Sequence, residues 1–98
     1  MKRPTCAALL FLFAQAASSA DVMKGGQIYR MHCASCHGAG GTSTMPNAPS
    51  FARGERLMQP DQMLLGSIRR GRGAMPGFFG VLTDRDTLDV IAYLRTMR

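Results

Sequence analysis

The run Cys33-Ala34-Ser35-Cys36-His37 constrains this chain more than any other feature of its sequence. Two cysteines one helical turn apart, followed at once by a histidine, are the attachment signature of a c-type haem. The spacing suits this chemistry, because both sulfurs can form thioether bonds to the vinyl groups on one side of the porphyrin while the imidazole binds the iron. The sequence therefore predicts one covalent haem c with iron, attached through Cys33 and Cys36 and ligated by His37.

Other interpretations of the two cysteines are weaker. A structural zinc site takes four ligands, usually from two separated pairs, and no second pair of Cys or His follows His37. A thioredoxin-like redox pair needs a βαβ context, and the chain shows no strand alternation that would build one. A local disulfide between Cys33 and Cys36 remains the plain alternative.

The first twenty residues have the pattern of a secretory signal peptide. Residues 1–4 carry the positive charges, residues 5–17 are an uncharged run, and residues 18–20 are small. The 13 residues of the uncharged run are fewer than the roughly 20 that a membrane-spanning helix needs. We expect export to the periplasm and cleavage after Ala20, although a cut after Ala16 also fits the small-x-small rule. The mature chain is expected to have no membrane span.

Residues 21–98 would then form a single domain of 78 residues, which is small for a self-sufficient apolar core. Chains of this size usually rely on disulfides, a metal or a cofactor, and Cys6 would leave with the leader. The formal net charge of +6 falls to +4 when Lys2 and Arg3 are removed. An exported protein meets little nucleic acid, so the charge predicts redox partners with acidic docking surfaces and no nucleic-acid partner.

The sixth iron position decides between an electron carrier and a haem enzyme. His32 directly precedes Cys33 and cannot reach the opposite face of the ring, so we expect it to face solvent. Methionine is then the candidate. The expected mature chain contains seven methionines: Met23, Met31, Met45, Met58, Met63, Met75 and Met97.

Position and local sequence separate these methionines. Five lie in or beside expected helices, where packing in the core is the default role. The other two each precede a proline. Met45, eight residues after His37, would have to hook tightly round the haem edge. Met75 lies 38 residues after His37, among glycines and a proline that favour a rigid loop, and the sequence predicts it as the ligand.

Helical signals divide the rest of the chain. We expect a first helix over residues 22–33, a loop over residues 38–50, and a middle helix over residues 60–70 that Gly71 ends. No strand pattern is present, so the predicted fold class is all-α.

The last helix has the clearest signals. Thr83 with Asp86 three residues later makes a capping-box-like start, and Arg95 and Arg98 suit the negative end of the helix dipole. Apolar residues recur at i, i+3, i+4 and i+7, at Val90, Tyr93, Leu94 and Met97.

These features together resemble class I cytochrome c, and the resemblance spans essentially all of residues 21–98. Family members place a glycine eight residues and an aromatic four residues before the first haem cysteine, here Gly25 and Tyr29. They end with an Ile-Ala-Tyr-Leu-like helix, here residues 91–94. The resemblance implies three main helices around one covalently bound haem. It also implies crossing terminal helices that approach closely at Gly25, with Tyr29 packed on Val90 and Tyr93.

The resemblance further implies a hydrogen bond between the free ring N–H of His37 and a proline carbonyl. Pro49 is the match in this sequence, and Pro46 is its rival. The short chain looks like the compact bacterial branch of the family. Residues 51–61 are also similar to the small monohaem cytochromes that accompany dissimilatory nitrite reductase.

Ligation by His37 and Met75 predicts a one-electron carrier, not an enzyme. We expect this carrier to be a monomer, and the resemblance of residues 51–61 implies a respiratory chain such as that of denitrification. Two alternatives remain: an accessory or maturation factor of a larger redox enzyme such as nitrite reductase, and a haem enzyme or gas-binding protein with an open iron site. The last fits poorly, because five-coordinate cytochromes c′ carry the attachment motif near the C-terminus and a peroxidase needs distal acid–base groups.

Three arginines, Arg69, Arg70 and Arg72, directly precede the Met75 loop. One interpretation is a solvated helix end, where the helix dipole favours cations. The other is a docking patch for an acidic redox partner.

Overall fold

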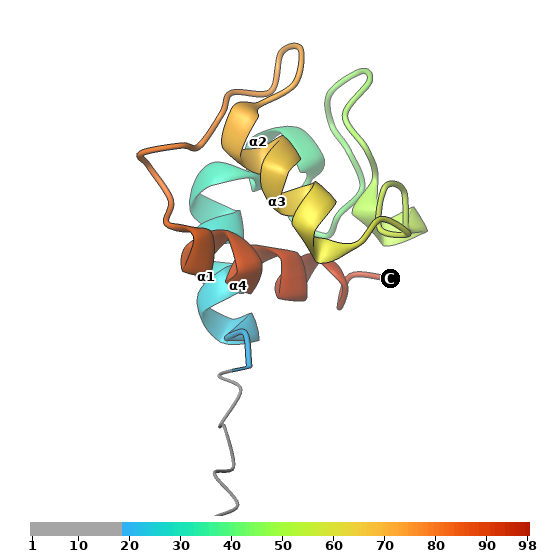
Figure 1. Cartoon of the computed structure of the whole chain (residues 1–98). Coiled ribbons are helices and arrows are strands. Elements are labelled where there is room, and N and C mark those ends of the chain that lie inside the picture. Colours follow the sequence, from blue (N-terminus) through green and yellow to red (C-terminus); the bar gives the residue numbers. More distant parts are fainter. Residues whose placement is uncertain (1–18) are drawn as a thin grey trace, which may run out of the picture.

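The computed structural model describes residues 19–98, which form an all-helical domain (Figure 1). The elements are α1 (Val22–His32), α2 (Ala34–His37), a short 3₁₀ helix η1 (Phe51–Arg53), α3 (Asp61–Arg70) and α4 (Asp84–Leu94). Within the described range no β-strand forms, and backbone bridges occur only between Arg72 and Met75 and between Phe79 and Leu82. The prediction of an all-α fold is confirmed. Residues 1–18 of the expected signal peptide lie outside the described residues.

Local hydrogen bonds set the limits of α1. The Asp21 carboxylate accepts the Lys24 backbone N–H at 3.0 Å and caps the first turn. The helix ends at His32, one residue earlier than predicted, because Cys33 has a φ of −117° and separates α1 from α2. The attachment motif therefore lies on its own short helix and not on a continuation of α1.

The limits of α3 and α4 follow the sequence signals closely. Pro60 is the N-cap of α3 rather than its first residue, and Gly71 ends the helix with a φ of 77°. The predicted capping box of α4 is present: Asp86 N–H donates to Thr83 Oγ1 at 3.0 Å, and Thr83 N–H donates to Asp86 Oδ2 at 3.2 Å. Lys24 Nζ lies 2.9 Å from Asp86 Oδ1. This hydrogen bond holds the pKa of Asp86 below its ordinary value and raises the pKa of Lys24.

The crossing of α1 and α4 organises the core (Figure 1). A Cβ atom at Gly25 would overlap the backbone carbonyl of Asp89, so only glycine permits this approach. Tyr29 is fully buried, its ring centroid lies 5.3 Å from that of Tyr93, and its hydroxyl donates to the Gly38 carbonyl. The predicted close approach at Gly25 and the contact between the tyrosines are confirmed. The buried apolar cluster consists of Tyr29, Phe51, Leu57, Leu64, Leu65, Val90, Ile91 and Leu94.

The packing predicted for four methionines is wrong. Each of the four is between 57% and 85% exposed to solvent: Met23, Met31, Met58 and Met63. On α1 the buried face contains Gly25 and Tyr29, and the helical period of 3.6 residues turns Met23 and Met31 away from it. Met97 does pack against the core cluster, as predicted.

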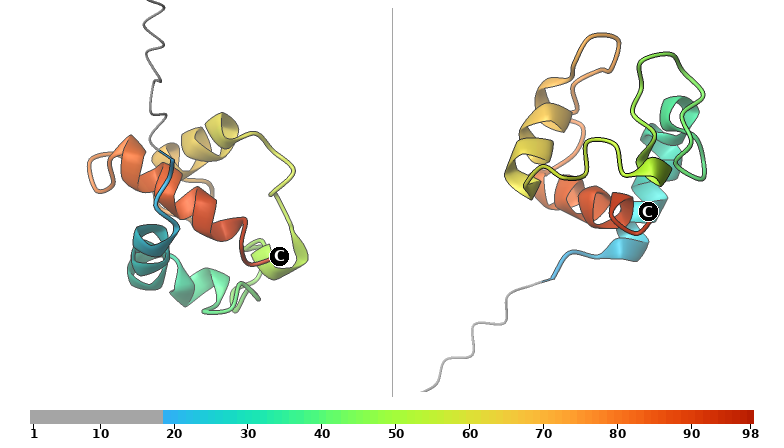
Figure 2. Two further views of the ribbon diagram at one scale, coloured as in Figure 1. Left: turned by 90° about the horizontal axis from the view of Figure 1, so that it is seen from below. Right: turned by 90° about the vertical axis from the view of Figure 1, so that its right-hand side faces the viewer.

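The connecting loops lie on two sides of the domain. In the right-hand view of Figure 2, α3 and the loop over residues 71–83 lie on one side, and α2 with the loop over residues 38–50 lies on the other. Helix α4 runs beneath both. None of the helices within residues 19–98 combines the length and the apolar character that crossing a membrane requires.

Candidate haem-binding site

The predicted iron ligand His37 is fixed from two directions. Its side chain is 7% exposed, and its Nδ1 lies 3.0 Å from the Pro49 carbonyl oxygen. A carbonyl oxygen can only accept, so Nδ1 carries the proton and Nε2 keeps its lone pair. The imidazole also stacks on Phe51, with ring centroids 4.5 Å apart. Pro49, and not Pro46, is therefore the proline that orients the ring.

The two motif cysteines lie on either side of the first turn of α2 and form no disulfide within the described residues. The His37 N–H donates to the Cys33 carbonyl at 3.0 Å, which closes this turn. Burial, together with the charge of nearby Cys36, raises the pKa of the Cys33 thiol to about 11. An unmodified Cys33 thiol would therefore be protonated at neutral pH. Residues 19–98 also contain no group of three or more His, Cys, Asp or Glu side chains arranged to hold a metal ion, so the zinc alternative finds no support.

The loop after α2 is tied back onto the attachment motif by hydroxyl groups. The Thr44 N–H donates to the Cys36 carbonyl at 3.1 Å, and the Thr44 hydroxyl donates to the Ser35 carbonyl at 2.9 Å. The Ser43 N–H in turn donates to Oγ of buried Ser50 at 3.0 Å. The sequence predicted a polar loop here but not these hydrogen bonds, because the amino-acid composition of a loop does not specify which donor binds which acceptor. Met45 is held on the outside of this loop and is 42% exposed.

The predicted second ligand, Met75, lies on a tight loop that packs against α3. Arg72 and Met75 exchange two backbone hydrogen bonds, at 3.0 and 2.9 Å. The Phe78 N–H donates to the Ile68 carbonyl at 3.0 Å, which attaches the end of the loop to α3. Met75 is half-buried. This loop lies on the opposite side of the domain from α2 (Figure 2).

The donor set therefore fits a haem c. One short helix and its N-cap present two cysteine sulfurs and a buried imidazole with a free Nε2, and a hydrogen-bonded loop on the other side of the domain carries a thioether. A His and Met pair is a known axial combination for c-type haem.

Comparison with known proteins decides the family. Residues 20–94 match the family model described as cytochrome c oxidase, cbb3-type, subunit III. The chain belongs to the cytochrome c family. It therefore carries one covalently attached haem c with its iron, and the recognition of a small class I cytochrome c is confirmed.

Several relatives of this cytochrome are cytochromes c6. The protein from Thermosynechococcus vestitus (strain NIES-2133 / IAM M-273 / BP-1) is 35% identical over 91 residues, which cover 89% of this chain and 80% of the relative. The protein from Thermostichus vulcanus is 34% identical over 96 residues, covering 91% and 84%. Among solved structures, cytochrome c6 from the diatom Phaeodactylum tricornutum has a TM-score of 0.66 at 28% identity, covering 79% of this chain and 93% of that chain. The KustC0563 c-type cytochrome has a TM-score of 0.68 at 26% identity, covering 76% and 96%.

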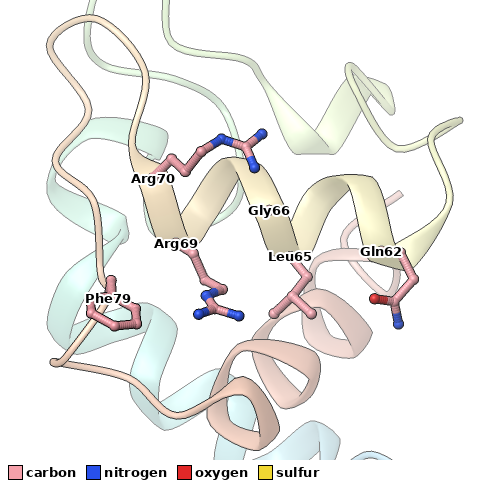
Figure 3. Close-up of a pocket in the computed structure, with 6 residues that line it drawn as sticks. All are labelled: Gln62, Leu65, Gly66, Arg69, Arg70 and Phe79. Atoms are coloured by element: carbon pink, nitrogen blue, oxygen red, sulfur yellow. The ribbon is translucent and has the colours of Figure 1, made fainter.

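A groove of about 370 Å³ lies outside the haem site, along the outer face of α3 (Figure 3). Its lining residues are Gln62, Leu65, Gly66, Arg69, Arg70 and Phe79. The Arg69 guanidinium lies over the Phe79 ring, 5.3 Å from its centroid, and its Nη1 is 3.2 Å from Asp84 Oδ1. None of the four predicted haem residues lines this groove, so it is a feature of the surface and not of the cofactor site.

Proposed function

We propose that this cytochrome is an exported one-electron carrier whose haem is attached to Cys33 and Cys36 and whose iron is ligated by His37 and Met75. The observation that carries this proposal is the hydrogen bond from buried His37 to Pro49, because it leaves Nε2 as the ring nitrogen available to iron. The bound haem supplies a one-electron couple at its iron.

His37 and Met75 would both hold the iron, so no open position would remain for a substrate and these residues would rearrange little when an electron is transferred. The soft thioether favours Fe(II), and burial disfavours the additional charge of Fe(III). The reduction potential should therefore lie well above that of a bis-histidine haem.

We place this carrier in the periplasm, as a monomer in a respiratory chain such as that of denitrification. The leader pattern of residues 1–20 supports export. The similarity of residues 51–61 to the cytochromes that accompany dissimilatory nitrite reductase supports the denitrification context.

The ligation is tested by Met75→Ala, with Met45→Ala as the matched control. Met75→Ala should produce a high-spin or water-ligated haem, lower the reduction potential and open the iron to carbon monoxide. Met45→Ala should leave the absorption spectrum nearly unchanged. A sulfur-to-iron charge-transfer band that survives in Met75→Ala and disappears in Met45→Ala would assign the ligand to Met45 instead.

We assign partner docking to the free arginines beside the Met75 loop. Arg69 lies over the Phe79 ring (Figure 3) and forms an ion pair with Asp84, so its charge is already compensated. Within residues 19–98, Arg70 and Arg72 are exposed and make no ion pair, which leaves their charge for an acidic surface of the redox partner. The structure thus divides the three arginines that the sequence grouped together.

A further inference from the structure

The N-terminal end of α1 lies against a buried carboxylate of α4. Asp89 is 1% exposed, and its Oδ1 accepts the backbone N–H of Asp21 at 2.8 Å. The side chain of Asp21 is engaged separately, as the cap of α1. The Gly25 N–H donates to the Asp21 carbonyl at 2.9 Å, so the contact adjoins the close crossing of α1 and α4 at Gly25.

A carboxylate that is almost fully buried requires compensation of its charge. Arg85, one turn earlier on α4, has its Nε 3.8 Å from Asp89 Oδ1 and is half-exposed, so this ion pair is long. From α1, Lys24 is directed to Asp86, at 2.9 Å. The backbone nitrogen of Asp21, at 2.8 Å, is therefore nearer to Asp89 Oδ1 than Arg85 Nε is.

We propose that the Ala20–Asp21 bond is the processing site and that its cleavage creates a partly buried ion pair between the new α-ammonium group of Asp21 and the Asp89 carboxylate. The proposal rests on the export proposed above. A signal peptidase would hydrolyse the bond with one water molecule: the hydroxyl group goes to the Ala20 carbonyl carbon and a proton goes to the Asp21 nitrogen. The amine then takes a second proton from solvent at neutral pH.

This geometry favours one of the two cleavage sites that the sequence left open. A cut after Ala20 turns the single N–H that faces Asp89 into a charged group with three donors. A cut after Ala16 would leave four residues attached, and the nitrogen of Asp21 would stay a neutral amide. Charged hydrogen bonds are roughly twice as strong as neutral ones, so only the first cut adds stability at the crossing of the terminal helices.

The ion pair gives the stability of the protein a defined pH dependence. The ordinary pKa of an α-amino group is about 7.7 to 8.0, and a buried carboxylate beside it raises that pKa. A group whose pKa is raised by folding contributes its full stability below its unfolded pKa and loses it as the pH rises through its folded pKa. The other charged groups nearby are Arg85, Lys24, Asp86 and the side chain of Asp21. Arg85 also donates from Nη2 to the Ser19 carbonyl at 3.0 Å, so the test below compares two forms that both lack Ser19.

The test compares two haem-loaded proteins, one beginning at Asp21 and one that retains Ala20, each with and without Asp89→Asn. Denaturant unfolding at about pH 7 should show that Asp89→Asn lowers the folding equilibrium constant about tenfold more in the form that begins at Asp21, which corresponds to a pKa rise of about one unit. At about pH 10 the difference should shrink, because the amine is then mostly neutral. Equal losses in the two forms at both pH values would overturn the proposal.

Two further measurements keep the test decisive even if Asp89→Asn folds poorly. The unmutated form that begins at Asp21 should lose stability relative to the form with Ala20 as the pH rises from about 7 to about 10; parallel curves would refute the ion pair. The mass of the exported protein should correspond to a chain that begins at Asp21, and one that begins at Ala17 would refute the processing site. Neither result affects the haem spectrum or the Met75→Ala experiment, so failure here is distinct from failure of the proposed function.

Discussion

Tyr29 joins the packing of the terminal helices to the loop that follows the haem-attachment motif. Its ring is buried at the crossing of α1 and α4, and its hydroxyl donates to the carbonyl of Gly38, the residue after His37. Burial is the main cause that raises the pKa of the Tyr29 hydroxyl to about 12. This side chain therefore resists ionisation under alkaline conditions.

We expect Tyr29→Phe to reduce the free energy of unfolding by about 1 to 2 kcal/mol, because the buried Gly38 carbonyl loses its donor. Tyr93→Phe is the matched control, since the Tyr93 hydroxyl makes no hydrogen bond within the described residues. Unfolding by denaturant would measure both. The unmutated protein should also lose stability as the pH rises from about 10 towards 12, because the unfolded tyrosine releases its proton first, and Tyr29→Phe should remove this component. Equal losses in the two variants would contradict the role of the hydroxyl.

The resemblance to class I cytochrome c predicted Tyr29 from its fixed distance before the first haem cysteine. It also predicted a proline partner for His37, but it left Pro46 as a rival to Pro49. It did not predict the contact between Asp21 and Asp89, which are 68 positions apart. A carboxylate on an amphipathic helix is normally expected to face solvent, and only the close approach at Gly25 places Asp89 in the interior.

At the scale of the elements, one side chain connects the C-terminal end of α4 to the start of α3. Arg95, at the C-terminal end of α4, binds Asp61, the first residue of α3, with its Nε at 3.0 Å and its Nη2 at 2.6 Å. The same guanidinium donates to the carbonyls of Leu57 at 2.7 Å and Gln59 at 2.9 Å. It thereby connects the end of α4 to the turn before α3 and to the start of that helix.

Arg95→Lys should reduce the free energy of unfolding by about 1 to 2 kcal/mol, although the positive charge is kept. An ammonium group lacks the planar fork that lets a guanidinium reach several acceptors in fixed directions. Arg98→Lys is the control, because Arg98 makes no side-chain hydrogen bond within the described residues. Thermal or denaturant unfolding of the two proteins measures the difference. If Arg95→Lys proves as stable as Arg98→Lys, the charge alone accounts for the role of Arg95.

Helix ends were predictable where the signal is local, as with the capping box of Thr83 and Asp86 and with Gly71. The sequence also placed Arg95 correctly at the negative end of the α4 dipole. Its pairing with Asp61 depends on how two helices meet, which local signals do not contain. For the same reason the helical positions of Met23 and Met31 did not predict their exposure.

At the scale of the whole molecule, the helices meet in a chain of contacts: α2 with α1, α1 with α4, and α4 with α3. The two predicted axial ligands lie on α2 and on the loop after α3, at opposite ends of this chain of contacts. A haem ligated by both would connect the two ends directly. This agrees with the need of a domain of about 80 residues for a cofactor in its core.

The distribution of charge on the whole molecule gives the last prediction. Arg70 and Arg72 lie beside the Met75 loop, whereas Arg98 lies at the C-terminus, away from that loop (Figure 1). If an acidic redox partner docks at this loop, Arg72→Glu should slow second-order electron transfer roughly three- to tenfold at low ionic strength. Arg98→Glu makes the same change in net charge and should slow the reaction much less.

Salt and potential measurements separate docking from other effects of Arg72→Glu. The reduction potential and haem spectrum should stay almost unchanged, because the substitution leaves the predicted iron ligands in place. The rates of the variant and the unmutated protein should converge as ionic strength rises towards about 1 M, where the screening length falls to about 3 Å. Stopped-flow kinetics with an acidic redox protein would measure both trends. Equal slowing by Arg72→Glu and Arg98→Glu would show that net charge alone steers the encounter. Rates that neither substitution changes would show that Arg70 and Arg72 only form a solvated helix end.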